Sequence, residues 1–457
     1  DDGVVYRYVD DGSGTGGDDG TGGVTTIEGK TDGEKWQNTV DALDTIGIAR
    51  DQVRTLMRAV CVVLQLGQLT FGVDPDNEDG SVVSSAGELE RLAALLGISA
   101  GDIAQSLTYR TITAGKGGGD SYTVPLRVDA ARDGCDAFAK EVYARSFDWL
   151  VGAINDATRA EENYGHAAEV ADFGIIGLLD IFGFESFQVN RFEQLCINYA
   201  NEKLQQKYTL DVFSSVQDEY EYEGISLGDL EYQDNADVLS LVEGRMGIIA
   251  VLNEECLRPN GNDTSFVQKI KTIHKEAAPL VDDRLHKPAE FAIQHYAGAV
   301  KYDATNFVTK NTDTLPRDLV QCAMKSDNEL IAGEFLNATK TKAEEAAATK
   351  PGRGRSSAVT VSATFRSQLA SLMTNIGETK TRYVRCIKPN PHKKPLEVDL
   401  LSSTEQLRCA GVVAAVNVSR AAFPNRLVHS TATERFYCLS SSAMAGRGEL
   451  GVGVNTD

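Results

Sequence analysis

The most regular pattern of apolar residues in the chain follows Arg191. More than thirty residues pass without Gly or Pro before Gly224, and apolar side chains recur every three, four or five positions: Phe192, Leu195, Cys196, Tyr199, Leu204, Tyr208 and Val212. A single stripe at this spacing predicts one long helix. A helix of about 30 residues spans about 45 Å, which is long enough to carry a small movement to a distant surface.

A different pattern leads into this helix. The preceding run is short and is interrupted by Gly177, and its apolar members are Ile175, Ile176, Leu178, Leu179 and Ile181. Such a run is typical of a strand that is buried on both faces. Residues 383–387 predict a second strand of the same kind.

Polar residues stand where the first of these strands would end, at Asp180, Gly183 and Glu185. In open α/β sheets this edge is where ligands bind. An aspartate there can hold Mg²⁺ through water, and a glycine lets its backbone N–H approach a terminal phosphate. The D-x-x-G pattern is weak on its own, because acidic loops contain it by chance.

The remaining patterns predict a mostly helical chain with a few hairpins. Helices are expected at 36–48, 51–66, 88–96, 135–157, 359–376 and 433–439. Weak alternation at 108–128, around three glycines, predicts a hairpin. Residues 237–276 predict a helix, a loop and a helix, and 291–308 predict two strands, with a helix following from Asn311.

Two short segments resemble ligand-binding loops but are interpreted otherwise. Gly29-Lys30-Thr31 lacks the glycine that a phosphate loop needs five positions earlier, where Val24 stands. Residues 74–80 begin like a calcium loop, but Asp79 and Ser85 occupy positions that require Gly and Glu. We expect a surface turn there.

Composition places the chain among ordinary globular proteins, with 457 residues, 42% apolar and 24% charged. The sequence contains no run of about 18 apolar residues, so it predicts no membrane-spanning helix. Eight cysteines without a C-x-x-C pair suit reduced thiols in the cytoplasm. The net charge of −21 argues against nucleic acid, and also against an acidic protein partner unless basic residues are concentrated locally. Residues 340–355 supply that concentration, with five basic and two acidic residues.

DIFGFE at 180–185, followed by FEQLCINYANEKLQQ at 192–206, resembles the switch II element and relay helix of the myosin motor domain, and the resemblance continues along most of the chain. It implies an α/β, predominantly helical fold, a partial P-loop NTPase head of the myosin–kinesin type with fragments of the central transducer sheet. It also implies five regions. The first is an upper 50-kDa region at 1–172, with 108–128 as its actin-facing loop, and the second contains switch II, the relay helix and the lower 50-kDa helix–loop–helix at 173–338. A basic loop 2 follows at 339–358, then the strut, a sheet strand and the reactive-thiol helices at 359–428, and finally the start of the converter with a disordered tail at 429–457.

The resemblance assigns roles around the phosphate. It implies that Asp180 lies near Mg²⁺ through water, that the Gly183 amide contacts the γ-phosphate of ATP, and that Glu185 pairs with a switch I arginine. Movement would then pass to the converter through the relay and thiol helices, with Phe192, Asn201, Cys409 and Gly411 as coupling residues. Ser419 occupies the second thiol position, so only one thiol could react there. Ala422 stands where a second hinge glycine is usual, and alanine resists positive φ.

The partner that the resemblance implies is F-actin. The helix–loop–helix would present Met246, Gly247, Leu257, Pro259 and Phe266, with Lys269 nearby; a core role for some of these residues is the alternative. Asp120 lies sixteen residues before a D-A-x-A-K motif, at a position that the family keeps acidic or phosphorylatable, so actin affinity would need no phosphorylation there. The basic segment would attract actin by raising the on-rate, in a salt-sensitive way, through Lys340, Lys342, Lys350, Arg353 and Arg355. A solvated loop aspartate and a plain interdomain linker remain the alternatives.

No glycine-rich Lys-Thr loop and no switch I sequence occurs in the 457 residues. We therefore expect an incomplete head. The complete protein would be an actin-activated Mg-ATPase of the cytoplasmic actin cytoskeleton, in a myosin complex, with ATP and Mg²⁺ as cofactors. This chain would neither bind ATP tightly nor hydrolyse it, and it lacks light-chain and cargo regions. The alternative is a non-catalytic actin-binding protein; a GTPase-like switch is disfavoured because no N/T-K-x-D signature is present.

Overall fold

The computed structural model describes residues 6–9, 26–27, 30–113, 121–159, 174, 176–224, 234–281, 286–312, 315–348, 360–413, 416 and 427–439. These residues form mostly helices, together with four small antiparallel sheets. The chain divides into two compact units, Asp1–Leu178 with Asp313–Ser357, and Leu179–Thr312 with Ala358–Asp457. None of the described helices is both long enough and apolar enough to cross a membrane.

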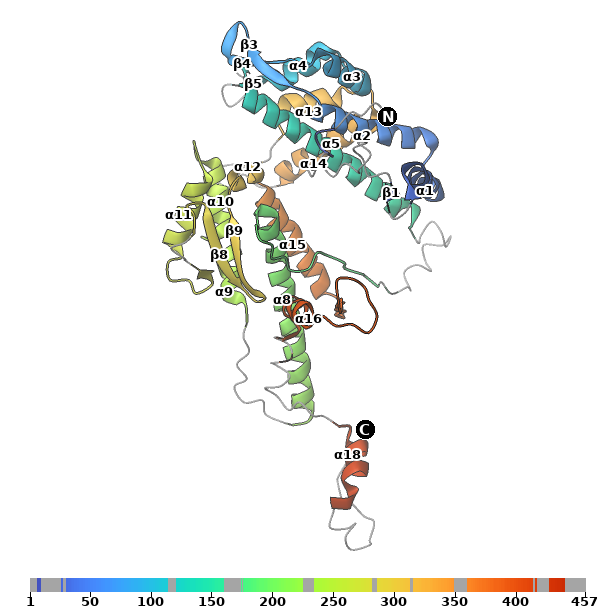
Figure 1. The fold of residues 1–457 in the computed structure, drawn as a ribbon, viewed down its shortest axis with the longest axis vertical. Coiled ribbons are helices and arrows are strands. Elements are labelled where there is room, and N and C mark those ends of the chain that lie inside the picture. The colour runs from blue at the N-terminus through green and yellow to red at the C-terminus, as the bar shows by residue number, and fades with distance from the viewer. Residues whose placement is uncertain are drawn as a thin grey trace. The chain divides into compact units, whose positions relative to one another are not determined.

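The first unit consists of helices with short hairpins at its surface (Figure 1). Its helices are α1 (Asp32–Thr45), α2 (Arg50–Gly67), α3 (Ala86–Leu96), α4 (Ala100–Thr108), α5 (Val128–Ala157), α13 (Arg317–Met324) and α14 (Glu329–Ala348). Its strands pair as β1 (Thr26–Ile27) with β2 (Lys30–Thr31), β3 (Phe71–Asp74) with β4 (Asn77–Val83), and β5 (Tyr109–Thr113) with β6 (Ser121–Pro125). The helices predicted at 36–48, 51–66, 88–96 and 135–157 are confirmed.

The core of the first unit lies between α2 and α5. Leu66 of α2 and Phe138 of α5 are completely buried. The ring of Phe138 meets Phe335 of α14 edge-on, with centroids 6.1 Å apart. These large side chains remove much apolar surface from water, which is the main stabilising term for such a unit.

A short N-terminal segment is anchored on this core. Both guanidinium nitrogens of Arg7 donate to Asp136 at 2.7 and 2.8 Å, and the Tyr8 hydroxyl donates to the same carboxylate at 2.6 Å. Burial alone would raise the pKa of Asp136, but the hydrogen bonds from Arg7 and Tyr8 outweigh it and lower that pKa. Asp136, the first residue of the D-A-x-A-K motif, therefore has a structural role that the motif did not reveal.

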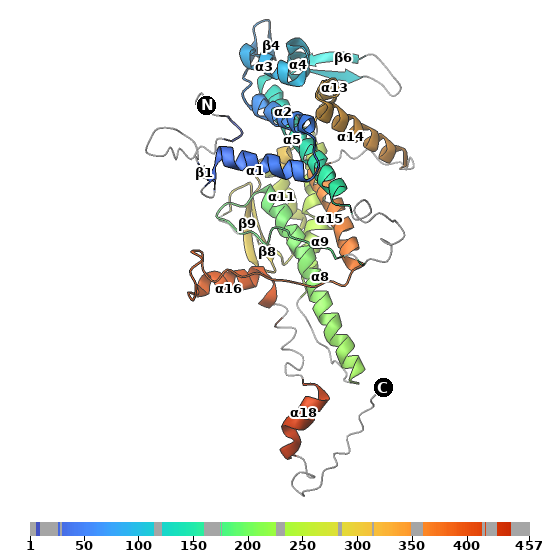
Figure 2. The same ribbon diagram turned by 90° about the vertical axis from the view of Figure 1, so that its right-hand side faces the viewer.

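The hairpins of the first unit show what becomes of three short segments: the predicted hairpin, the predicted surface turn and the segment that resembles a phosphate loop. The hairpin at 108–128 is confirmed as β5 and β6 (Figure 2), whereas its tip, with Asp120, lies outside the described residues. The surface turn at 74–80 is confirmed as the turn between β3 and β4. Thr31 caps α1, because its hydroxyl accepts the N–H of Glu34 at 3.3 Å while the Glu34 carboxylate accepts the N–H of Thr31 at 2.8 Å.

The second unit is built around α8 (Phe192–Tyr222). The other helices are α9 (Ala236–Glu243), α10 (Ile248–Leu257), α11 (Asp263–Ile273), α12 (Phe307–Asn311), α15 (Val361–Gly377), α16 (Leu400–Cys409) and α18 (His429–Phe436), which continues as a 3-10 turn, Tyr437–Leu439. A sheet has the order β7 (Leu280–Val281), β8 (Glu290–His295), β9 (Gly298–Asp303). The helix–loop–helix and the strand pair predicted from the sequence are confirmed.

α8 is the long helix that the apolar stripe predicted (Figure 1). It begins after Arg191, whose N–H donates to the Gln194 side chain at 3.0 Å. α15 and the β8–β9 hairpin flank its first half, and the end of α16 lies beside its middle (Figure 2). The buried side of this half includes Phe192, Leu195 and Tyr199.

Both predicted buried strands are wrong. Residues 176–187 and 380–388 form neither helix nor strand, and the side chains of Ile176, Leu178 and Val384 are 90%, 95% and 82% exposed. A strand satisfies its backbone groups by pairing with a neighbour, and no described strand pairs with either segment. Apolar composition predicted burial, but burial depends on neighbouring strands that the described residues do not provide.

Candidate functional site

The segment 180–185 lies against the first turns of α8, where two asparagines hold its backbone. Asn198 Oδ1 accepts the N–H of Glu185 at 2.8 Å, and Asn198 Nδ2 donates to the carbonyl of Glu185 at 2.8 Å. Asn201 Nδ2 donates to the carbonyl of Phe182 at 3.1 Å. Residues 198 and 201 lie on one face of the helix, so the segment is fixed at two points.

The Glu185 side chain also faces α8. Gln194 Nε2 donates to its Oε2 at 3.2 Å, from the turn that precedes Asn198. Phe184 points to the β8–β9 hairpin, and its ring lies 5.3 Å from the rings of both His295 and Tyr296, edge-on. The segment is therefore attached to two elements, one helix and one hairpin.

Asp180 and Gly183 are open to solvent. A Cβ placed on Gly183 would meet no atom within 4 Å, so its backbone can be approached closely. No group of three or more His, Cys, Asp or Glu residues in the described part of the chain is arranged to hold a metal ion. One exposed carboxylate and one open glycine do not make a complete site for Mg²⁺ and ATP, and the described residues alone do not fit that cofactor pair.

α8 and the turn of the β8–β9 hairpin contact the residues expected to carry movement onward. The Tyr296 hydroxyl donates to the carbonyl of Cys409 at 2.7 Å, and Gln205 Nε2 lies 3.5 Å from the carbonyl of Gly411. Gly411 has a φ of +70°, and a Cβ there would lie 1.8 Å from Gln205 Oε1. Only glycine fits this position. Burial raises the pKa of the Cys409 thiol, which lowers its ionised fraction.

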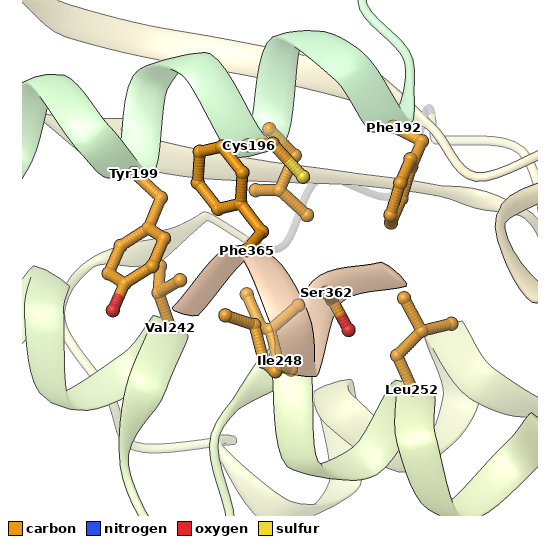
Figure 3. Close-up of a pocket in the computed structure, with 10 residues that line it drawn as sticks. Phe192, Cys196, Tyr199, Val242, Ile248, Leu252, Ser362 and Phe365 are labelled. Atoms are coloured by element: carbon orange, nitrogen blue, oxygen red, sulfur yellow. The ribbon is translucent and has the colours of Figure 1, made fainter. Parts of the chain in front are cut away.

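The N-terminal turns of α8 pack tightly on two neighbouring helices. Figure 3 shows Phe192, Cys196 and Tyr199 of α8 facing α10, with Ser362 and Phe365 of α15 between them. The space left, about 10 Å³, is no more than one water needs. Burial raises the pKa of Cys196 to about 12, so its thiol is an apolar packing group.

A larger apolar cavity of about 260 Å³ lies beside the segment. It is lined by Ile181, Phe182, Ile197, Ala200, Phe365, Gln368, Leu369 and Leu372. The sequence did not indicate it, because its walls come from three separate stretches. The packing of α15 against α8 brings them together.

The residues expected at an actin-binding surface separate into exposed and buried groups. Met246 and Leu257 are 52% and 56% exposed, and Pro259 is also exposed. Gly247 is buried before the first turn of α10. The expectation for Phe266 is wrong, because its side chain is completely buried and its ring packs 6.1 Å from those of Phe291 and Phe307.

Lys269 has partners of its own. Its Nζ lies 3.0 Å from Glu254 and 2.8 Å from Glu255, and the Glu255 side chain is completely buried. Burial would raise the pKa of Glu255, but the hydrogen bond from Lys269 outweighs it and lowers that pKa. The first role of Lys269 is therefore to neutralise a buried carboxylate.

The basic segment is less of a linker than expected. α14 continues to Ala348, so Lys340 and Lys342 lie in a helix. Lys350, Arg353 and Arg355 lie outside the described residues. At the far side of the segment, the start of α15 is anchored by Asn253, whose Oδ1 accepts from the hydroxyls of Thr360 at 2.6 Å and Ser362 at 2.9 Å.

Comparison with known proteins agrees with these features. The model of the family "Myosin head (motor domain)" matches residues 20–451. Myosin-52 of Schizosaccharomyces pombe is 36% identical over 427 residues, which are 93% of this chain and 27% of that protein. Unconventional myosin-Vc of Homo sapiens is 34% identical, over 89% of this chain and 23% of its own length, and unconventional myosin-Ic of Bos taurus is 34% identical, over 94% and 40%.

The chain thus spans about a quarter of the length of the first two relatives and less than half of the third. The family model nevertheless matches nearly all residues of this chain, including the segment 180–185 and α8. The chain belongs to the myosin head (motor domain) family.

Proposed function

We propose that this chain is part of an actin-based motor that acts on the cytoplasmic actin cytoskeleton. In the complete protein, ATP hydrolysis and phosphate release displace the segment 180–185. α8 follows that displacement and passes it to the segment 409–411, from which a converter rotates. Asp180, Gly183 and Glu185 are the residues of this chain that act at the nucleotide.

The observation that carries the proposal is the double attachment of α8. Asn198 and Asn201 hold the backbone of the segment 180–185, and Gln205 lies against Gly411 only one turn further along the same helix. A displacement of the segment is therefore transmitted over a short, rigid path. Membership in the myosin head family supports a transmission of movement from the segment 180–185 to the segment 409–411.

We further propose that the nucleotide site is completed by residues outside these 457. Phosphoryl transfer depends on positioning and charge neutralisation. The sequence contains neither the glycine-rich Lys-Thr loop nor the switch I residues that would supply them. On this proposal those residues complete a P-loop NTPase fold.

Actin is proposed to bind at three places. The exposed apolar residues Met246, Leu257 and Pro259 make the specific contact, and the β5–β6 hairpin with Asp120 makes a second. The basic residues of 340–355 attract the filament at longer range. The local excess of positive charge supports this, because the chain as a whole carries −21.

Two assays test the proposal together. Co-sedimentation with actin filaments, with and without ATP, is combined with steady-state ATPase measurements on this chain and on the complete protein. We expect the chain to bind filaments regardless of ATP and to show no turnover, whereas the complete protein dissociates with ATP and is activated by actin. Actin-stimulated turnover by the 457 residues would overturn the second half of the proposal.

The rival function is a non-catalytic actin-binding protein. The contacts of α8 with the segment 180–185 and with Gly411 do not require ATP, so the structure also fits such a protein. Filament binding by the complete protein that ignores ATP would favour this rival over the motor.

A further inference from the structure

A chain of completely buried polar side chains lies behind the segment 180–185. Asn198 Nδ2 lies 2.9 Å from the Tyr302 hydroxyl, which lies 2.8 Å from His295 Nε2. His295 Nδ1 in turn lies 2.9 Å from Glu202 Oε1. The side chains of Glu202 and His295 have no exposed surface, and Asn198 and Tyr302 are completely buried as well. The chain begins and ends on α8 and passes through β8 and β9.

The hydrogens in this chain can be assigned from the segment inward. Asn198 Oδ1 accepts the N–H of Glu185, so the other end of the amide is its NH₂ group. One hydrogen of that group goes to the carbonyl of Glu185, and the other goes to the Tyr302 oxygen. The Tyr302 oxygen therefore accepts from Asn198, and its own hydrogen remains for His295.

The assignment continues to the carboxylate. Since Tyr302 donates to Nε2 of His295, that nitrogen carries no hydrogen, and the imidazole hydrogen is on Nδ1. Nδ1–H then donates to Glu202, whose Oε1 also accepts the N–H of Tyr296 at 3.1 Å. The Asn235 side chain donates to Oε2 of the same carboxylate. Every donor and acceptor in the chain is paired.

The opposite direction leaves a group unpaired. If Nε2 of His295 carried a hydrogen, the Tyr302 oxygen would accept from both His295 and Asn198, and its own hydrogen would have no acceptor among the described contacts. A buried hydroxyl without a partner is unfavourable, because it loses its hydrogen bonds to water and gains none in return. Burial also raises the pKa of Tyr302, so its hydroxyl keeps the hydrogen that this assignment needs.

We propose that Asn198, Tyr302, His295 and Glu202 form a one-way hydrogen-bonded chain, with His295 as the Nδ1–H tautomer, and that Tyr302, His295 and Glu202 are positioning residues for the backbone of Glu185. They touch neither nucleotide nor reacting atoms. They orient the Asn198 amide, which could otherwise turn about its own side chain. The segment 180–185 then either moves together with α8 or breaks the bond to Asn198.

Hydrogen exchange on the full chain tests the positioning role. Tyr302→Phe removes the hydroxyl that orients Asn198, and we expect the Glu185 amide to exchange about tenfold faster, the factor that corresponds to one net hydrogen bond. Tyr199→Phe is the matched control, because Tyr199 neighbours Asn198 on α8 and its hydroxyl donates to Glu243 instead. Unchanged exchange in Tyr302→Phe, or equal acceleration in both variants, would overturn the role.

The tautomer is measured on the wild-type chain, and a variant serves only to assign the signals. The chain has six histidines, and ¹⁵N labelling of their rings gives a separate pair of nitrogen signals for each. His295→Asn identifies the pair that belongs to His295. We expect a hydrogen on Nδ1 and none on Nε2. A hydrogen on Nε2 would overturn the assignment.

The proposal that this hydrogen-bonded chain helps to couple the segment 180–185 to α8 in a motor rests on the proposed function. Neither of the two measurements rests on that function. Neither needs ATP, Mg²⁺ or actin. If the chain proves to be a non-catalytic actin-binding protein, the exchange and tautomer results still hold. If instead they fail, the motor proposal stands but loses this part of its coupling.

Discussion

Single residues in this chain often serve the fold where a surface role was expected. Lys269 was expected near an actin-binding surface, yet its amino group neutralises the buried Glu255. A buried charge that loses its partner is expensive, because the carboxylate cannot be solvated in place. The loss of Lys269 should therefore first be felt as a loss of stability.

Lys269→Met tests this at the residue scale. We expect the free energy of unfolding to fall by about 1–3 kcal/mol, as for other buried groups left without a partner. Urea unfolding of the chain measures it, and Lys275→Met, at an exposed lysine after α11, is the control. If Lys269→Met is as stable as the control but binds actin less tightly, the surface role is correct and the structural one is wrong.

Asp136 makes a pH-dependent contribution. Its pKa in the folded chain lies below the usual value, so the stabilisation is present above about pH 4 and is lost as pH falls through the folded-state pKa. We expect Asp136→Asn to lower the free energy of unfolding by about 1–3 kcal/mol at neutral pH. The difference between variant and wild type should vanish in acid.

Denaturant unfolding across the pH range measures this difference. Asp133→Asn is the control, because Asp133 is exposed in the same helix. A difference that stays constant into acid would mean that Asp136 acts through packing and not through its charge.

At the scale of elements, helices could be predicted and isolated strands could not. α8 follows from its own stripe, because a helix satisfies its backbone internally. The runs at 176–181 and 383–387 had equally clear apolar composition, but a strand depends on a neighbour that the run does not encode. The same limit applies to the site. D-x-x-G pointed to Asp180 and Gly183, whereas Asn198 and Tyr302 could not be linked before β9 was placed beside α8.

Gly411 allows a test of the contact between α8 and the segment after α16. Gly411→Ala should destabilise α16 in two ways: through its positive φ, which costs a non-glycine residue about 1–2 kcal/mol, and through the collision with Gln205. Gln205→Ala removes only the collision. In the Gln205→Ala background, Gly411→Ala should therefore be less harmful but still unfavourable.

Amide exchange across α16 measures both effects. Gly377→Ala is the control, since a Cβ there meets nothing within 4 Å and its φ is ordinary. If Gly411→Ala has the same effect with and without Gln205, the two residues do not pack together, and the path from α8 to α16 is broken at this point.

At the scale of the whole molecule, charge and apolar surface are distributed unevenly. The chain carries −21, yet 340–355 carries an excess of three positive charges. Composition alone argued against an acidic partner, and only the local count reversed that argument. Part of the segment is helical, because α14 extends to Ala348. The alanines and glutamates at 343–348 favour helix, so the predicted linker begins later than the basic residues do.

The last prediction concerns this basic segment. Replacing Lys350, Arg353 and Arg355 by Gln removes three charges without adding bulk. At roughly 0.5 kcal/mol for each exposed charge, affinity for actin filaments should fall about tenfold at low ionic strength. The effect should shrink as salt is added, because a Debye length of about 10 Å at 0.1 M screens exposed charges.

Co-sedimentation over a range of salt measures the affinity. The control replaces Lys30, Arg50 and Arg54 by Gln. These three basic residues are exposed, lie near the N-terminus of the chain, and their replacement changes the net charge equally. A loss confined to the first variant means that the position of the charges matters, as a filament tether requires. Equal losses would mean that actin responds to net charge alone, and no loss would favour the alternative that the basic segment 340–355 is a plain interdomain linker.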